Sequence, residues 1–122
     1  MTWRETLRRA IESRSEIEAS DERAAARQTS GCVAVDEVRD RCPASVSGVL
    51  RSVTLRPREG VQALEAELFD GSGTLDLVWL GRRTIAGITP GRRLRADGFV
   101  CAIAGRRTIF NPRYELRSRP GE

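Results

Sequence analysis

The chain has 122 residues, of which 39% are hydrophobic and 31% charged, and this is the size and composition of one compact domain. It has no histidine, and its three cysteines, Cys32, Cys42 and Cys101, form no C-x-x-C pair, which excludes the usual zinc ligand sets and histidine-activated nucleophiles. The 21 basic residues are all arginine and, against 17 acidic residues, leave a net charge of +4. We therefore expect a non-enzymatic protein without a metal or other cofactor.

The sequence also bears on the compartment. No apolar run approaches the roughly eighteen residues of a membrane-spanning helix, and charge from Arg4 onward does not fit a secretory signal. An odd number of cysteines without an export signal fits reduced thiols. We expect a cytoplasmic protein with no membrane partner.

Residues 1–43 predict an N-terminal helical extension. Within residues 2–27, apolar side chains recur at three- and four-residue steps between arginines and glutamates: Trp3, Leu7, Ile11 and Ile17. Residues 33–41 fit one further helical turn with Val35 and Val38 facing inward. We expect the helix to pack on the domain that follows; pairing with a second copy or with a protein partner is the alternative.

Residues 44–117 change to short β-rich runs separated by glycine and proline, which indicates an all-β domain. Five strands are expected, at about residues 46–56, 62–69, 74–80 and 92–104 and from 108 onward. Turns are expected at 58–60, 70–73 and 105–107. Gly48 predicts a bend that lets the first strand serve two sides of a barrel, and the tail at 118–122 is expected to fray.

Charge is unevenly distributed along the chain. From Arg82 to Arg119, ten arginines face only Asp97 and Glu115. A local excess of this size attracts polyanions from solution, and the phosphate backbones of nucleic acids are the obvious candidates.

Five short segments occur in a specific order and spacing: 46–49 (VSGV), 68–75 (LFDGSGTL), 78–81 (VWLG), 88–94 (ITPGRRL) and 96–100 (ADGFV). In this order they resemble the OB-fold nucleic-acid-binding family, in the form found in helicase wedge domains and in anticodon-binding regions of tRNA synthetases. The stand-alone form is similar to small OB-fold proteins of actinobacteria. The resemblance covers residues 46–116 and implies a mainly β, five-stranded OB-fold barrel with an N-terminal α-helical extension. One departure is that the usual helix between the third and fourth strands is reduced to residues 82–87, so we expect the barrel bottom to be plugged differently, by the N-terminal helix.

The resemblance also implies where a ligand binds. OB folds bind oligonucleotides across the outer face of the second and third strands, between the loops that join strands one to two and four to five. Here these loops carry Arg56 and Arg58, and Arg106 and Arg107. Guanidinium groups fit phosphate oxygens and also stack on bases. A second candidate track lies in the connection after the third strand and at the start of the fourth: Arg82, Arg83, Arg93 and Arg95.

The outer face carries one aromatic candidate and three acids. Phe69 shares the outward parity of Glu65 and Glu67 and is a candidate stacking platform for a base, with simple packing as the alternative. Trp79 follows the core parity. Glu65, Glu67 and Asp76 project from the face where phosphate is expected and would repel it. Either a strand passes over the rims while these carboxylates accept hydrogen bonds from base amino groups, or the face binds a protein.

We therefore expect a module that binds single-stranded or structured DNA or RNA through arginine–phosphate contacts, with weak sequence preference. The alternative is a protein–protein interaction adaptor that uses the barrel and the N-terminal helix, because an OB fold does not by itself specify its ligand.

Overall fold

The computed structural model describes residues 16–19 and 31–118. Residues 16–19 are helical; the remainder of the helix expected over residues 2–27, and residues 119–122 of the expected frayed tail, lie outside the described residues. Within the described part of the chain, no helix is long and apolar enough to cross a bilayer.

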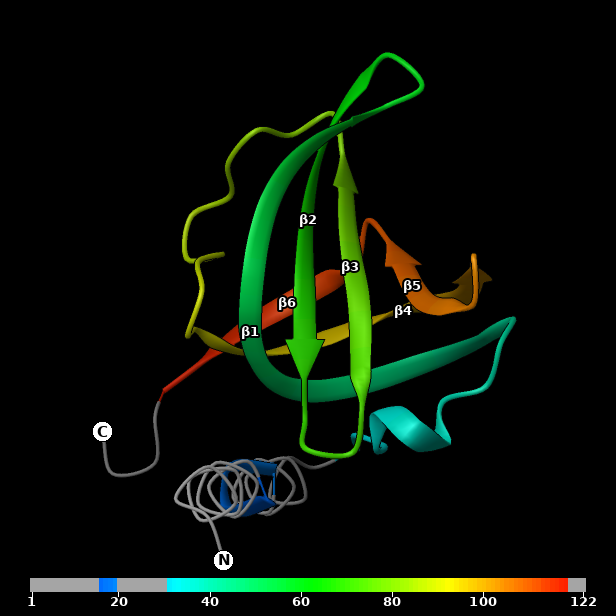
Figure 1. Ribbon diagram of the computed structural model, residues 1–122, viewed down its shortest axis with the longest axis vertical. Helices are drawn as coiled ribbons and strands as arrows, with labels where there is room; N and C mark the ends of the chain where they lie inside the picture. Colours follow the sequence, from blue (N-terminus) through cyan, green and yellow to red (C-terminus); the bar gives the residue numbers. More distant parts are fainter. Residues whose placement is uncertain (1–15, 20–30, 119–122) are drawn as a thin grey trace, which may run out of the picture.

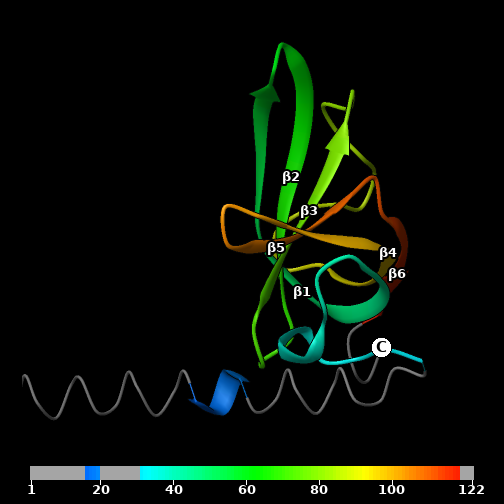
Figure 2. The ribbon, with the colours of Figure 1, turned by 90° about the vertical axis from the view of Figure 1, so that its right-hand side faces the viewer.

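Six strands form one closed sheet (Figures 1 and 2). They are β1 (Cys42–Arg58), β2 (Val61–Phe69), β3 (Thr74–Leu80), β4 (Arg93–Ile103), β5 (Arg106–Phe110) and β6 (Arg113–Arg117). The ring runs β1-β2-β3-β5-β4 and closes through the β1–β4 pairing, while β6 adds to the first half of β4. All pairs are antiparallel except β3 and β5. The predicted mainly β, OB-like barrel is confirmed.

The long strand β1 closes the barrel because it bends. Its first half pairs with β4 and its second half with β2, and the register shifts at a bulge between Leu50 and Ser52. A Cβ atom at Gly48 would collide with the backbone carbonyl of Phe69, so only glycine lets β1 pass so close to the end of β2. The strand begins at Cys42, earlier than the sequence predicted, because its pairing with β4 already starts there.

Two hairpin turns are tighter than expected. Glu59 and Gly60 (φ 47° and 79°) join β1 to β2, and Ala104 and Gly105 (φ 51° and 79°) join β4 to β5. Positive φ at both central residues is the type I′ geometry of two-residue hairpins. The turn predicted at residues 105–107 is therefore corrected, because Arg106 and Arg107 already belong to β5.

The last predicted strand is divided in two. β5 ends at Phe110 and β6 begins at Arg113. Between them Asn111 adopts a positive φ of 51°, and Pro112 has no N–H to donate to a ladder. The chain therefore turns here and adds a sixth strand to the five of the ring.

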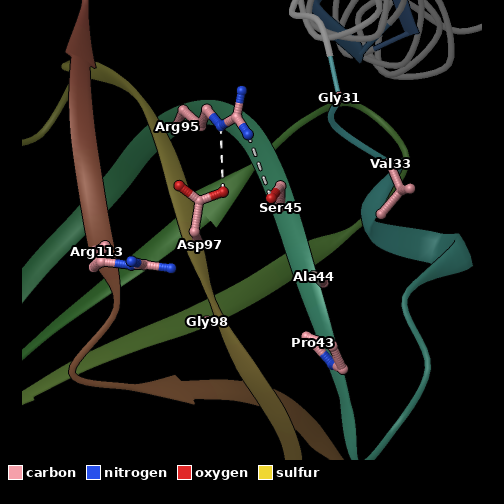
Figure 3. A pocket seen from close by; sticks show the side chains of 9 residues that line it. All are labelled: Gly31, Val33, Pro43, Ala44, Ser45, Arg95, Asp97, Gly98 and Arg113. Atoms are coloured by element: carbon pink, nitrogen blue, oxygen red, sulfur yellow. Dashed lines mark hydrogen bonds and ion pairs between the residues drawn. The ribbon is translucent and has the colours of Figure 1, made fainter.

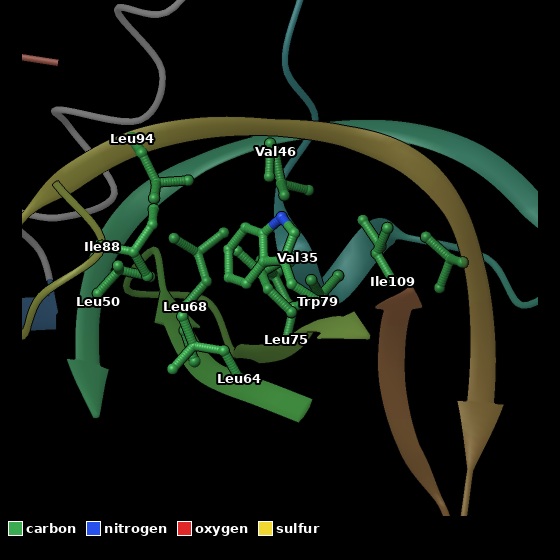
Figure 4. Packing of buried hydrophobic residues seen from close by; sticks show 14 of the residues in the cluster. Val35, Val46, Leu50, Leu64, Leu68, Leu75, Trp79, Ile88, Leu94 and Ile109 are labelled. Atoms are coloured by element: carbon green, nitrogen blue, oxygen red, sulfur yellow. The ribbon is translucent and has the colours of Figure 1, made fainter. Parts of the chain in front are cut away.

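The core fills the inside of the barrel (Figure 4). Every strand of the ring contributes to it: Val46, Leu50, Leu64, Leu68, Leu75, Leu77, Leu94, Val100 and Ile109. Trp79 is also buried, its indole N–H donates to the carbonyl of Pro112 at 3.2 Å, and its ring packs edge-on against Tyr114. Trp79 is thus structural, as its parity predicts.

A short 3₁₀ turn, η1 (Val35–Glu37), closes the end of the barrel beside the β2–β3 turn (Figures 1 and 2). Val35 is fully buried and Val38 is 7% exposed, which confirms the predicted helical turn with these two valines facing inward. The plug therefore comes from the segment just before β1. Ile85 of the β3–β4 connection also belongs to the core.

The plug is fastened by one buried carboxylate. Oδ2 of Asp70 accepts the N–H of Val35 at 2.8 Å. Its Oδ1 accepts the N–H of Ser72 at 2.9 Å, the hydroxyl of Ser72 at 2.7 Å and the N–H of Gly73 at 3.1 Å. Asp70 is 1% exposed, so this buried side chain shapes the β2–β3 turn and ties the plug to it. The N–H of Asp36, which donates to the hydroxyl of Ser72 at 3.1 Å, adds a second and exposed link.

Candidate nucleic-acid interface

A groove of about 480 Å³ lies across the outer face of β1, β2 and β3 and reaches the β4–β5 turn. Arg56 and Arg58, at the end of β1, stand at one rim, and Arg106, at the start of β5, stands at the other. Side chains of Ser52, Thr54, Glu65, Glu67, Asp76 and Thr108 also line it. The arginines at the end of β1 and at the start of β5 therefore border one groove, at the place where the OB resemblance expects a ligand.

The carboxylates of the groove are paired with its arginines. Nε of Arg58 donates to Oε1 of Glu65 at 2.6 Å, and Nε of Arg56 lies 3.9 Å from Oε2 of the same residue. Three arginines and three carboxylates line the groove, so the formal charges cancel. The acids therefore do not face an incoming phosphate as free negative charges, because each of them already has an arginine as its partner.

Arg106 makes the most extensive of these pairs. Its Nε and one terminal nitrogen bind the two oxygens of Asp76 at 2.7 and 2.8 Å, and the same terminal nitrogen reaches Glu67 at 3.2 Å. Hydrogen bonding to Asp76 is the main cause that raises the pKa of Arg106 further above its ordinary value. Parallel pairing of a guanidinium fork with a carboxylate fixes the orientation of both groups.

Two half-buried aromatic rings differ in how closely an arginine lies above them. The guanidinium of Arg51 lies 3.4 Å from the centre of the Phe69 ring, so the predicted platform is already covered by a cation. Phe110, which was not among the predicted site residues, shares the parity of the groove residues Arg106 and Thr108 along β5. Strand alternation within β5 would have identified it, had the start of that strand been placed correctly.

The other predicted arginines do not line the groove. Arg107 follows Arg106 in β5, so its side chain leaves the opposite face, and its Nε donates to the carbonyl of Val38 at 3.4 Å. Arg82 and Arg83 are exposed in the connection after β3. The structure separates these three arginines from those at the groove.

Arg93 and Arg95 lie on β4, and Arg95 lines a second hollow of about 580 Å³ (Figure 3). There its Nε donates to Asp97 at 3.2 Å and a terminal nitrogen lies 3.5 Å from the hydroxyl of Ser45. Arg113 approaches Asp97 from β6, its partner in the register (Figure 3). This hollow is formed by β1, β4 and β6 together with Gly31 and Val33 of the upstream segment, and it shares no lining residue with the groove.

Asp97 is the titratable carboxylate of this second hollow. Partial burial acts to raise the pKa of Asp97, but hydrogen bonds from Ser45 and Arg95, together with the charges of Arg95 and Arg113, outweigh it. The pKa therefore lies below its usual value, and the carboxylate is ionised at neutral pH.

The cysteine and acidic side chains are the ones in this sequence that could ligate a metal ion. The three cysteines are free and half-buried. In the parts of the chain that the structure covers, 16–19 and 31–118, no three cysteine or acidic side chains gather in a way that could hold a metal ion.

Comparison with known proteins finds the fold again in a larger protein. A structure of RecG bound to a three-way DNA junction matches 74% of this chain with a TM-score of 0.59 and 21% sequence identity. The chain spans 13% of the RecG chain. No protein-family model and no curated protein matches the sequence. At this level of identity the likeness concerns the OB-like fold alone.

Proposed function

We propose that this protein binds single-stranded or structured DNA or RNA in the groove between Arg58 and Arg106. The observation that carries the proposal is the position of the groove, which crosses the outer strands between the arginines at the end of β1 and the arginine at the start of β5. OB folds bind oligonucleotides in this position. The DNA junction bound to RecG, whose structure contains a similar barrel, supports the same class of ligand.

The ion pairs of the groove do not prevent phosphate binding. The side chains of Arg56 and Arg106 are 68% and 54% exposed, and those of their partners Glu65, Glu67 and Asp76 are 19%, 33% and 23% exposed. Solvent on the arginine side screens these pairs, so each contributes on the order of 1 kcal/mol. A phosphate can therefore replace a carboxylate as the partner of the guanidinium fork at small cost. The released carboxylates of Glu67 and Asp76 then accept hydrogen bonds from base amino groups. Because the arginines contact the backbone, sequence preference is weak.

We further infer that the chain is a binding module and not an enzyme, and that it acts in the cytoplasm without a cofactor. The absence of histidine from the sequence and the pairing of the groove carboxylates with arginines support a role in binding. The three free cysteines fit a reducing compartment.

The test is a titration of a labelled single-stranded oligonucleotide of about twelve nucleotides, a length suited to one OB fold, and of a duplex of equal length. Fluorescence anisotropy is measured at two salt concentrations for the wild type and for a variant with Arg56→Ala, Arg58→Ala and Arg106→Ala. A matched control removes three exposed arginines outside the groove: Arg39, Arg82 and Arg92.

The expected wild-type slope of log affinity against log salt is roughly −2 for three neutralised phosphates on a single strand. The groove variant should lose most of this slope and bind at least about tenfold more weakly, whereas the control should lose less. Equal weakening in both variants would reject the groove and leave only non-specific charge.

A protein ligand is the second candidate, and one observation favours it. The groove has balanced charge, and Val61 and Leu80, near its upper end, are 46% and 40% exposed. Polar grooves edged by apolar side chains also suit peptide ligands. If the wild type binds neither oligonucleotide at either salt concentration, the adaptor hypothesis replaces the nucleic-acid one.

A further inference from the structure

We propose that Phe110 and Arg58 form a slot that takes one unpaired base of the bound nucleic acid. This inference rests on the proposed function and adds to it the kind of nucleotide that the site selects. The guanidinium carbon of Arg58 lies 5.7 Å from the centre of the Phe110 ring, and both side chains lie on the groove side of the barrel.

The comparison with the second aromatic of the outer face shows why this ring and not the other is the platform. Arg51 lies on Phe69 at 3.4 Å, in direct contact. Arg58 stands 5.7 Å from Phe110, close to the limit of about 6 Å for a cation–π contact. The first ring is in contact with its cation, whereas Arg58 stands farther from the second ring, so that a pivot of the guanidinium about its Nε bond to Glu65 makes room for a base.

Glu65 holds Arg58 in this position. Its Oε1 accepts the Nε–H of Arg58 at 2.6 Å, and this bond does not involve the two terminal nitrogens of the guanidinium. A planar guanidinium fixed at Nε can stack on a base and still donate to a phosphate from its terminal nitrogens. Glu65 is thus a positioning residue for the slot.

The surroundings of Phe110 suit a base more than a phosphate. In the register Phe110 is opposite Val78, which is fully buried, and Leu80, two residues further along β3, is 40% exposed. The charged part of the groove begins two residues earlier along both strands, at the register pair of Asp76 and Thr108. A nucleotide can therefore place its base on the apolar part and its phosphate on the charged part.

An unpaired base is required because a base inside a duplex is stacked on both faces and cannot enter between two side chains without being extruded. Every base has a π face, so a slot of this kind tolerates any sequence. The slot therefore predicts a preference for single strands, or for junctions with unpaired nucleotides, over continuous duplex.

The test uses the complete chain and labelled oligo-dT of about twelve nucleotides, together with a strand of the same length in which all sites are abasic. Phe110→Leu removes the ring and keeps an apolar side chain, and Phe69→Leu is the matched control on the covered ring. Phe110→Trp keeps a platform, and Arg58→Gln removes the cation above it. Thermal unfolding followed by circular dichroism verifies that each variant is folded.

We expect Phe110→Leu to weaken oligo-dT binding about 5- to 100-fold, the range for loss of one base stack. Phe69→Leu should change it less than about twofold, and Phe110→Trp should retain it. On the abasic strand Phe110→Leu and the wild type should bind equally, because there is no base to stack. If Phe110→Leu is unfolded, Arg58→Gln replaces it: because Arg58 contacts both base and phosphate, this variant should lose more affinity for oligo-dT than for the abasic strand, and equal losses would overturn the slot.

The slot is wrong if Phe110→Leu binds oligo-dT as tightly as the wild type does, or if this variant loses as much affinity for the abasic strand as for oligo-dT. In both cases the proposed function stands. Failure of the wild type to bind oligo-dT overturns both. If Phe69→Leu weakens binding of oligo-dT as much as Phe110→Leu does, the slot is also rejected, because the ring in contact with Arg51 would then matter as much as Phe110.

Discussion

The buried carboxylate of Asp70 gives the sharpest test of how the barrel is closed. It accepts backbone N–H groups from both the plug and the β2–β3 turn, and it is 1% exposed. Asp70→Asn keeps one oxygen for the turn but presents an amide N–H₂ to the N–H of Val35, so that two donors face each other. Asp70→Ala removes both acceptors.

The magnitude follows from the donors left without a partner. A buried donor that loses its acceptor costs about 1–3 kcal/mol. For Asp70→Asn one such donor is lost, the buried N–H of Val35, so we expect the free energy of unfolding to fall by about 1–3 kcal/mol. Asp70→Ala also releases the partly buried N–H groups of Ser72 and Gly73, and we expect about 2–5 kcal/mol.

Urea denaturation measures this directly. With a slope of about 2 kcal/mol per molar, the midpoint of Asp70→Asn should be lower by about 1 M. Asp36→Asn is the matched control, because it makes the same chemical change at an exposed position of the plug and should stay within about 0.5 kcal/mol of the wild type. A midpoint for Asp70→Asn equal to that of Asp36→Asn would refute the view that Asp70 fastens the plug.

Two further predictions concern the backbone of β1 and the second hollow. Gly48→Ala should lower the free energy of unfolding by at least about 1–3 kcal/mol, because the new Cβ meets the carbonyl of Phe69. Gly73→Ala is the control: the nearest atom to its Cβ is a side-chain methyl at 3.4 Å, so it should lower the free energy of unfolding clearly less in the same urea titration. Equal losses of stability in the two variants would contradict the argument. The lowered pKa of Asp97 means that its contribution to stability is complete above about pH 4 and is lost as the pH falls through its folded-state pKa. The stability difference between wild type and Asp97→Asn should therefore shrink between neutral pH and about pH 2, and a constant difference over that range would count against it.

Much of the fold could be predicted because local signals agreed with the tertiary structure. The alternation in residues 62–69 and the D-G-S-G turn at 70–73 both place β2 and its hairpin. Gly48 marked the bend in β1 because only glycine permits that close approach. The ends of strands were predicted less well, since β1 is extended by its pairing with β4, a contact between residues far apart in sequence.

The site was harder to predict, for two physical reasons. Strand alternation does not apply within a turn, and the turn was expected at 105–107, whereas β5 already begins at Arg106. This is why Arg106 and Arg107 were placed together and Phe110 was overlooked. Alternation also shows which side chains share a face but not which of them pair. It gave Glu65 and Asp76 as isolated acids, whereas the structure joins them to Arg58 and Arg106.

The origin of the plug has a practical consequence for anyone who isolates this barrel. Val35 and Val38 precede the first residue of β1 and yet are part of the hydrophobic core. A fragment cut at the start of the strands would keep every β-strand and still lack the floor on which they close. Expression boundaries should accordingly be set upstream of Val33, whose N–H donates to the carbonyl of Ser45 at 2.9 Å.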